Sequence, residues 1–239
     1  MSVTAIVLAA GKGKRMHTDV AKQFLPLGGK PLICYSLDVF EKSKYVDEIY
    51  LVTGEDAIEY CRNEIVGKYG YGKVTDVIAG GKERYHSVWN ALAAAGPHSA
   101  DYVLIHDGAR PFVTEEIISG NLEVLKTEKA CVTGMPSKDT VKISSEEGYV
   151  TDTPKRANVW NIQTPQSFEY SLIYEAYRKL IVSEKEVLAK GIQVTDDAMV
   201  VENFGNSKVK LVEGSYENIK ITTPEDLDIA EILLKRRGL

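Results

Sequence analysis

The chain begins with the stretch VTAIVLAAGKGKRM, residues 3–16, in which an apolar run leads directly into a loop with two glycines and three cations. The apolar residues predict a buried strand over 3–9. Backbone N–H groups of a glycine-bearing loop directly after a strand can surround an anion closely. In residues 1–30, five Lys and Arg residues face one carboxylate, Asp19, although the whole chain has a net charge of −5. The stretch therefore predicts an anion-binding loop, although on charge alone a solvated basic loop would explain it as well.

Beyond this strand, short apolar runs alternate with longer segments of helical period, which is typical of β-α units around a mostly parallel sheet. Strands are expected near 3–9, 48–53, 74–79, 101–106 and 130–135, and helices near 31–43, 56–68, 83–95 and 114–127. The chain should finish with a helix near 169–182, strands at 208–212 and 218–222, and a helix from 224. Pro31 suits the first position of its helix, and Thr223 suits the N-cap of the last one. We therefore predict an α/β fold.

The pattern changes at residues 137–160, where two short alternating strands flank the turn Ser-Ser-Glu-Glu-Gly. This predicts a protruding β-hairpin arm. A two-stranded ribbon is only marginally stable in water unless it packs against something else. A second subunit is one candidate, so we expect the arm to serve dimerisation.

Composition limits the class of protein. With 239 residues, 44% hydrophobic and 26% charged, the chain can form one globular domain spanning residues 1–239. We expect a soluble, cytoplasmic protein, because no export signal and no uninterrupted apolar run of about 18 residues is visible. The three cysteines are far apart, which argues against a disulfide framework and a zinc site. The negative net charge gives no reason to expect binding to nucleic acid or to a membrane.

Two common phosphate-binding motifs do not fit the first loop. A dinucleotide fingerprint needs a third small residue where Met16 stands and an acidic residue at a strand end about 20 residues later. Asp38 falls inside a predicted helix instead. A Walker loop needs Gly-Lys-Ser/Thr, whereas Gly13 is followed by Lys14 and Arg15.

The pattern Ala9-Ala10-Gly11-x-Gly13-x-Arg15-Met16, followed by Lys22-Gln23-Phe24, resembles the signature of sugar-phosphate nucleotidyltransferases, specifically their cytidylyltransferase branch. The resemblance implies a Rossmann-like three-layer fold. It also implies that the loop, with Ala9, Ala10, Gly11, Lys12 and Gly13, wraps a nucleoside triphosphate. Arg15 and Lys22 would stabilise the transition state.

Further matches in chain order resemble the 2-C-methyl-D-erythritol 4-phosphate cytidylyltransferase family. They are Ala79-Gly80-Gly81-Lys82-Glu83-Arg84 with Ser87-Val88, His106-Asp107-Gly108-Ala109-Arg110-Pro111, Lys138-Asp139-Thr140, Arg156-Ala157-Asn158-Val159-Trp160, Gln163-Thr164-Pro165-Gln166 and Asn218-Ile219-Lys220-Ile221-Thr222. In this family the elements with Gly80, Gly81, Lys82 and Ser87 surround the cytosine base. Thr195-Asp196-Asp197-Ala198 also resembles a family element, but we interpret it as a helix start, because threonine followed by acids caps helices well.

The resemblance also implies roles for residues later in the chain. Asp107 should emerge at the carboxyl end of a buried strand, where open α/β sheets bind ligands, and should help to hold Mg²⁺ and the nucleotide. The alternative is that Asp107 caps a helix or pairs with Arg110. Lys220 would be a third catalytic cation. The second substrate would meet five residues, with the phosphate held partly across a dimer interface: Asp107, Arg110, Thr140, Arg156 and Thr164.

The sequence therefore predicts a homodimeric, magnesium-dependent cytidylyltransferase. It would convert CTP and 2-C-methyl-D-erythritol 4-phosphate to 4-diphosphocytidyl-2-C-methyl-D-erythritol and pyrophosphate, in the non-mevalonate synthesis of isoprenoid precursors. A ribitol 5-phosphate cytidylyltransferase, making CDP-ribitol, is the nearest alternative. A dinucleotide-dependent reductase is a distant alternative, as is a non-catalytic ligand-binding module.

Overall fold

The computed structural model describes residues 1–11, 13 and 21–238 of the chain. A seven-stranded sheet lies at the centre, and its strands in spatial order are β11 (Lys210–Glu213), β7 (Ala130–Pro136), β10 (Trp160–Glu169), β6 (Tyr102–Asp107), β1 (Val3–Ala9), β4 (Glu48–Thr53) and β5 (Val74–Ala79). Every pairing is parallel except those of β10, which is antiparallel to both of its neighbours. The predicted α/β fold with a mostly parallel sheet is confirmed.

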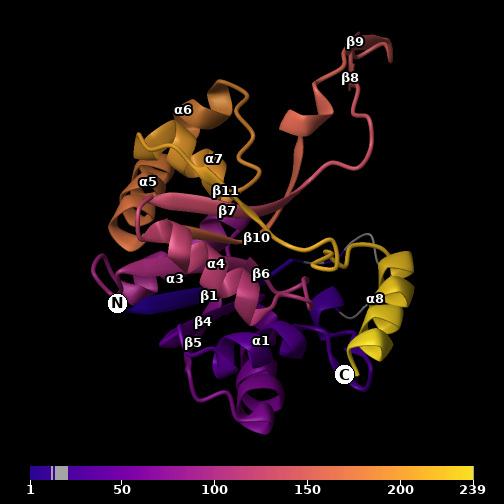
Figure 1. The fold of residues 1–239 in the computed structure, drawn as a ribbon. Coiled ribbons are helices and arrows are strands. Elements are labelled where there is room, and N and C mark those ends of the chain that lie inside the picture. Colours follow the sequence, from indigo (N-terminus) through magenta and orange to yellow (C-terminus); the bar gives the residue numbers. More distant parts are fainter. Residues whose placement is uncertain (12, 14–20, 239) are drawn as a thin grey trace.

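Helices cover both faces of this sheet, which gives the molecule three layers (Figure 1). Alternate side chains of β1 enter opposite cores, with Val7 in one and Ile6 in the other. The first core is covered by α1 (Ile33–Lys42), the π-helical segment η4 (Cys61–Gly67) and α4 (Glu115–Leu125). The second is covered by α3 (Arg84–Ala95), α5 (Tyr170–Val182), α6 (Glu184–Ala189), α7 (Asp197–Val200) and the π-helical segment η6 (Val201–Gly205). Parallel strands require this burial on both sides, and the Rossmann-like arrangement is confirmed.

Four parallel strands end nearly level with one another. In the register of the sheet, Ala9 of β1 lies beside Thr53 of β4, and Thr53 lies beside Ala79 of β5. On the other side of β1, Leu8 lies beside Asp107, the last residue of β6. The glycine loop after β1, the Gly80-Gly81 segment after β5 and Asp107 therefore meet at one edge of the sheet.

Helix α8 (Pro224–Arg237) closes this edge from outside the sheet (Figure 1). It begins with the predicted Thr223 N-cap, which forms a capping box with Asp226. Its Leu233 and Leu234 pack into a third core with Leu27 of the small hairpin β2 (Pro26–Leu27) and β3 (Lys30–Pro31). The packing of α8 fixes the path of the preceding segment, 218–222, over the sheet edge.

Strand β10 is absent from the prediction. Its sequence, WNIQTPQSFE, carries no apolar alternation because several of its buried side chains are polar. Gln166, for example, is buried but accepts hydrogen bonds from the backbone N–H groups of Asp197 and Ala198, both at 2.9 Å. The strand also contains a register shift between Ile162 and Gln166, next to Pro165.

The predicted strand at 218–222 is wrong. This segment forms no strand, and is fixed instead by single hydrogen bonds. The N–H of Ile221 donates to the carbonyl of Ala109 at 2.9 Å, and the carbonyl of Asn218 accepts from Arg110 at 2.7 Å. Ile221 is buried, but it packs against α8 and not within the sheet.

Three details of the predicted helices also differ. Pro31 lies in β3, and α1 begins two residues later. The helix predicted near 56–68 is irregular, with a 3₁₀ turn η3 (Glu55–Ala57), a short α2 (Ile58–Tyr60) and the π-helical η4. Helix α7 starts as predicted, but Asp196 rather than Thr195 is its N-cap. Over the part of the chain that the structure describes, no helix is both long and apolar enough to cross a bilayer.

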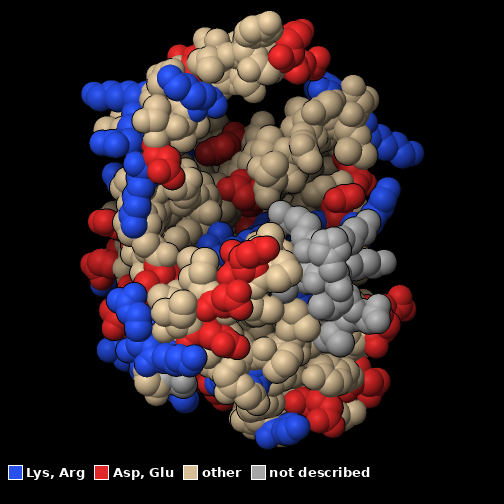
Figure 2. Space-filling view, turned by 90° about the vertical axis from the view of Figure 1, so that its right-hand side faces the viewer, with Lys and Arg blue, Asp and Glu red and all other residues tan. Residues whose placement is uncertain are grey.

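The predicted arm is confirmed as a feature of the fold. Strands β8 (Ile143–Ser144) and β9 (Val150–Asp152) form their own antiparallel sheet, and the 3₁₀ turn η5 (Arg156–Asn158) leads back to β10. The arm projects away from the body, and open space separates its tip from the rest of the surface (Figures 1 and 2). Large apolar side chains remain exposed on it, including Tyr149 at 75% and Val150 at 60%.

Candidate active site

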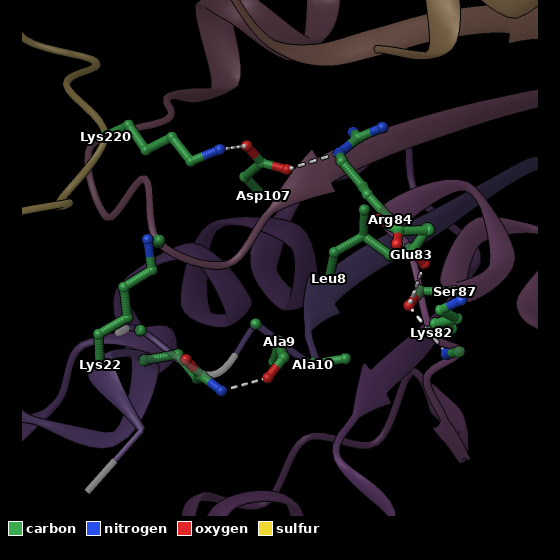
Figure 3. A pocket seen from close by; sticks show the side chains of 15 residues that line it. Leu8, Ala9, Ala10, Lys22, Lys82, Glu83, Arg84, Ser87, Asp107 and Lys220 are labelled. Carbon is green, nitrogen blue, oxygen red and sulfur yellow. Dashed lines mark hydrogen bonds and ion pairs between the residues drawn. The ribbon is translucent and has the colours of Figure 1, made fainter. Parts of the chain in front are cut away.

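A cavity of about 600 Å³ lies at the edge where β1, β5 and β6 end. This volume is in the range of small-molecule sites. The side chains that line it are shown in Figure 3. They are Leu8, Ala9, Ala10, Gly11, Gly13, Lys22, Gln23, Gly81, Lys82, Glu83, Arg84, Ser87, Asp107, Ala109 and Lys220. Ten of these had been predicted as site residues, and the structure brings them together from five separate stretches of the chain.

The glycine loop forms one wall of the cavity. Gly13 has φ of 58°, a left-handed conformation that favours glycine, and a Cβ added there would lie 3.2 Å from Cβ of Lys22. Lys22 begins the 3₁₀ helix η2 (Lys22–Phe24), and the buried Gln23 next to it donates a hydrogen bond to the carbonyl of Ala9. This hydrogen bond fastens η2 to the end of β1. Two predicted residues of this wall, Lys12 and Arg15, lie outside the described residues.

The opposite wall follows β5 and is built for close backbone approach. The N–H of Gly80 donates to the carbonyl of Thr53 at 2.7 Å, and a Cβ added at Gly80 would lie 2.3 Å from Cβ of Ala10. The N–H of Gly81 donates to the hydroxyl oxygen of Ser87 at 3.0 Å. Gly80 and Gly81 therefore let the chain after β5 pack directly against Ala10 and His86, and this close packing fixes the cavity wall that runs from Gly81 to Ser87.

Asp107 lies between two cations. Its Oδ2 is 2.6 Å from Nζ of Lys220, and its Oδ1 is 3.4 Å from Nε of Arg84 (Figure 3). Burial raises the pKa of Asp107, but the charges of Arg84 and Lys220 outweigh burial and hold the pKa well below its ordinary value. The carboxylate is therefore ionised at neutral pH. The sequence had also allowed an ion pair between Asp107 and Arg110. In the structure, Asp107 pairs instead with Arg84 and Lys220.

Lys22 and Lys220 are brought near each other by the 218–222 segment. Nζ of Lys22 donates to the carbonyl of Ile221 at 2.9 Å, directly after Lys220. The described lining contains four cations, Lys22, Lys82, Arg84 and Lys220, against two carboxylates, Glu83 and Asp107, a net charge of +2. In a protein whose net charge is −5, this excess favours an anionic ligand in the cavity.

Asp107 is held from behind by a buried chain of hydrogen bonds. Its N–H donates to the hydroxyl oxygen of Thr164 at 3.0 Å, and the same oxygen lies 3.0 Å from Nδ1 of His106. Nε2 of His106 lies 3.1 Å from the carbonyl of Arg110, and because a carbonyl can only accept, Nε2 carries the ring proton and the Thr164 hydroxyl donates to Nδ1. Burial lowers the pKa of His106 to about 4, which keeps this ring neutral at neutral pH.

Four residues predicted to bind the second substrate lie outside the lining. The buried Arg110 donates to the carbonyls of Asn218 and Ile162, at 2.7 and 3.3 Å, and it lies with Thr164 behind the cavity wall. Thr140 and Arg156 are exposed on the arm. Substrate binding by these residues stays a prediction.

Sequence reasoning missed several lining residues, of which Arg84 matters most because it contacts Asp107. Arg84 belongs to the Gly80-Gly81-x-x-Arg84 pattern, and Gln23 belongs to Lys22-Gln23-Phe24, so both lay inside quoted motifs. His86, which lies beside these residues, is part of the helix start, because its Nδ1 accepts from the N–H of Glu83 in the capping box of α3.

The residues at the cavity fit a magnesium ion that arrives with a ligand. No group of three or more His, Cys, Asp or Glu side chains that could hold a metal occurs within the described ranges. Among the residues that the structure describes, however, Arg84 is the one ion-pair partner of Asp107 Oδ1, and that contact is long, at 3.4 Å. Magnesium commonly takes one or two carboxylates and completes its shell with phosphates and water. A single carboxylate beside a phosphate site satisfies that requirement.

Comparison with known proteins gives one family. The family model described as IspD, 2-C-methyl-D-erythritol 4-phosphate cytidylyltransferase, matches residues 3–236. A curated protein of that name from Lachnospira eligens is 52% identical over 232 residues, which cover 97% of this chain and 99% of the relative. One from Clostridium kluyveri is 50% identical over 231 residues, covering 97% of this chain and 96% of the relative.

Solved structures agree. The 4-diphosphocytidyl-2C-methyl-D-erythritol synthase of Anaerococcus prevotii has a TM-score of 0.84 and 40% identity, covering 98% of this chain and 96% of its own. The 2-C-methyl-D-erythritol 4-phosphate cytidylyltransferase of Francisella tularensis has a TM-score of 0.78 and 31% identity, covering 97% of this chain and 99% of its own.

Proposed function

Since the chain belongs to the 2-C-methyl-D-erythritol 4-phosphate cytidylyltransferase family, we propose that its cavity joins CTP to 2-C-methyl-D-erythritol 4-phosphate and releases pyrophosphate. One observation carries the proposal. Lys22 and Lys220 converge with Gly11, Gly13 and Asp107 on one cavity, whose other wall runs from Gly81 to Ser87. A triphosphate and a flat base can lie there together.

The reaction forms a bond between a phosphate oxygen of the sugar alcohol and the α-phosphorus of CTP, and it breaks the bond to pyrophosphate. The attacking phosphate has a second pKa near ~6, so it is largely a dianion at neutral pH and needs no general base. The four histidines of the chain are therefore not required for proton transfer.

The protein must instead reduce repulsion between the anions and stabilise charge on the α-phosphate and the leaving pyrophosphate. In the proposal, Lys22 and Lys220 do this, together with Arg15, and amides of the glycine loop hold the terminal phosphates. Lys220 exchanges its contact with Asp107 for a contact with phosphate. Fixed positive charges in a partly enclosed cavity stabilise the transition state more than the same charges would in water.

Asp107 would hold magnesium through Oδ1. When bound, the ion supplies further positive charge to the phosphates. Asp107 suits this task because its pKa is held low, so the carboxylate remains ionised and able to bind a cation.

The arm would complete the site of a second copy. Thr140 and Arg156 are exposed on the arm and absent from the cavity of their own chain, and the apolar tip around Tyr149 lacks cover within the described chain. We therefore propose a homodimer of single-domain protomers, 1–239, in which the arm at 137–160 places Arg156 beside the partner's sugar phosphate. The planar guanidinium can hold a phosphate at two points.

A cytoplasmic location is part of the same proposal. The three cysteines, Cys34, Cys61 and Cys131, are all free and buried, which is compatible with a reducing compartment.

An assay of pyrophosphate release tests the function. Purified protein would receive CTP and Mg²⁺ with either 2-C-methyl-D-erythritol 4-phosphate or ribitol 5-phosphate, and mass spectrometry would identify the nucleotide product. We expect turnover with the methylerythritol substrate and much slower turnover with ribitol phosphate. Preference for ribitol phosphate would favour the alternative cytidylyltransferase, and absence of pyrophosphate with both would refute the proposed activity.

A further inference from the structure

Arg84 contacts two carboxylates, and it contacts them unequally. Its terminal nitrogens Nη1 and Nη2 each lie 2.7 Å from one oxygen of Asp197. Only Nε faces Asp107, at 3.4 Å. Charge-assisted hydrogen bonds to carboxylates are about 2.7–2.9 Å long, so the pair with Asp197 is strong and the contact with Asp107 is weak.

Asp197 is rigidly held and has no contact with solvent. Its side chain is fully buried, and Oδ1 also accepts a hydrogen bond from the hydroxyl of Tyr177 at 2.5 Å. Its backbone N–H donates to the buried side-chain oxygen of Gln166 at 2.9 Å, at the start of α7. A buried charge requires a partner, and Arg84 is the cation that supplies it.

The guanidinium is planar, and its donors point in fixed directions. Because the paired Nη donors face Asp197, they cannot also grip Asp107. Asp107 is the second carboxylate that Arg84 contacts, and in the proposed reaction it must release Lys220 and bind a cation. A bidentate pair between Arg84 and Asp107 would occupy both of its oxygens.

We propose that Asp197 is a positioning residue that holds the terminal donors of Arg84 away from Asp107, so that Asp107 remains available in the active site. This inference rests on the proposed function of the cavity. It gives the Thr195-Asp196-Asp197-Ala198 element a role beyond starting a helix, because Asp197, the first residue of α7, then supports the active site.

The decisive variant is Asp197→Asn. Asparagine offers one acceptor instead of two, and its amide nitrogen would face a donor of Arg84. We expect Arg84 to turn toward Asp107 and kcat/KM to fall on the order of 10²-fold, the scale of a misplaced active-site group. The matched control is Asp196→Asn, because Asp196 lies in the same turn but binds Met199 and Gln166 instead of Arg84. Its kcat/KM should stay near the wild-type value.

Rescue separates this role from a merely structural one. The double variant Arg84→Gln/Asp197→Asn removes both charges, so no free guanidinium remains to grip Asp107. We expect it to be at least about tenfold more active than Asp197→Asn, although it carries one more substitution. The double variant also leaves no unpaired buried charge, which makes it the test of choice if Asp197→Asn does not fold.

A crystal structure of Asp197→Asn provides a second readout that needs no activity. We expect the terminal nitrogens of Arg84 within about 3 Å of the Asp107 carboxylate. Arg84 in its original position, full activity of Asp197→Asn, or a double variant no more active than the single one would each overturn the inference. An inactive wild-type protein would refute the proposed function instead, because the movement of Arg84 would still be visible.

Discussion

Replacing Lys220 by alanine should separate catalysis from stability. Lys220 forms the 2.6 Å ion pair with Asp107, and in the proposed reaction it transfers to phosphate. Loss of one such stabilising group typically lowers kcat about 10²–10³-fold, equivalent to roughly 2.7–4 kcal/mol of barrier. The fall should appear at saturating substrate, because the charge acts mainly in the transition state.

The same substitution should cost little stability. The Lys220 side chain is 40% exposed, so solvent screens its ion pair, and pairs of this kind contribute about 1 kcal/mol or less to the free energy of unfolding. Asp107 also retains Arg84 as a neighbour, so it is not left as an isolated buried charge. We therefore expect a barrier change at least about three times the change in stability.

The assay compares steady-state pyrophosphate release with urea unfolding followed by circular dichroism. Lys208→Ala is the matched control, because Lys208 is an exposed lysine outside the cavity lining, and this variant should keep both values. Folded Lys220→Ala with kcat near the wild-type value would refute the catalytic assignment. A stability loss large enough to unfold the protein would refute the estimate from exposure.

Three further predictions follow from packing and exposure. Gly80→Ala should raise KM for CTP at least about tenfold and cost about 1–3 kcal/mol of stability, because its Cβ would lie 2.3 Å from that of Ala10. The control is Gly120→Ala in α4, where the nearest contact of an added Cβ is at 3.8 Å. This variant should leave both KM and stability unchanged. Thiol titration with a disulfide reagent near pH ~8 should detect none of the three cysteines in native protein and all three after denaturation. All three are buried, and burial raises the pKa of Cys131 to about 12, which keeps its thiol protonated. Fast labelling of the native protein would contradict this prediction. Tyr149→Asp should raise the dimer dissociation constant at least about tenfold in sedimentation experiments, because it places a charge on the apolar arm tip; an unchanged dimer, or a wild-type monomer, would count against dimerisation through the arm.

The apolar strands of the sheet could be predicted because short runs of apolar residues indicate buried strands. β1, β4, β5, β6 and β7 lie within one residue of the expected positions at each end. β10 could not be found this way, because polar residues such as Gln166 and Ser167 fill its core positions. These polar side chains can be buried because groups distant in the sequence form hydrogen bonds with them. The side-chain oxygen of Asn121, for example, accepts from the hydroxyl of Ser167 at 3.1 Å, and no local sequence pattern indicates such a partner.

The cavity could be anticipated from motifs, but its internal contacts could not. Resemblance to a family identified Lys22, Asp107 and Lys220 as site residues, and the level ends of the parallel strands explain why they meet. The ion pairs of Arg84 join positions separated by 23 and 113 residues. No local pattern specifies such pairs, because they depend on how α3 and α7 pack beside the sheet.

A crystal structure with CTP and Mg²⁺ tests the central claim most directly. The account predicts the triphosphate against the glycine loop with Lys22 and Lys220 in contact with its phosphates, and the base beside Gly81 and Ser87. CTP bound elsewhere, or bound in this cavity with both lysines turned away from the phosphates, would contradict it.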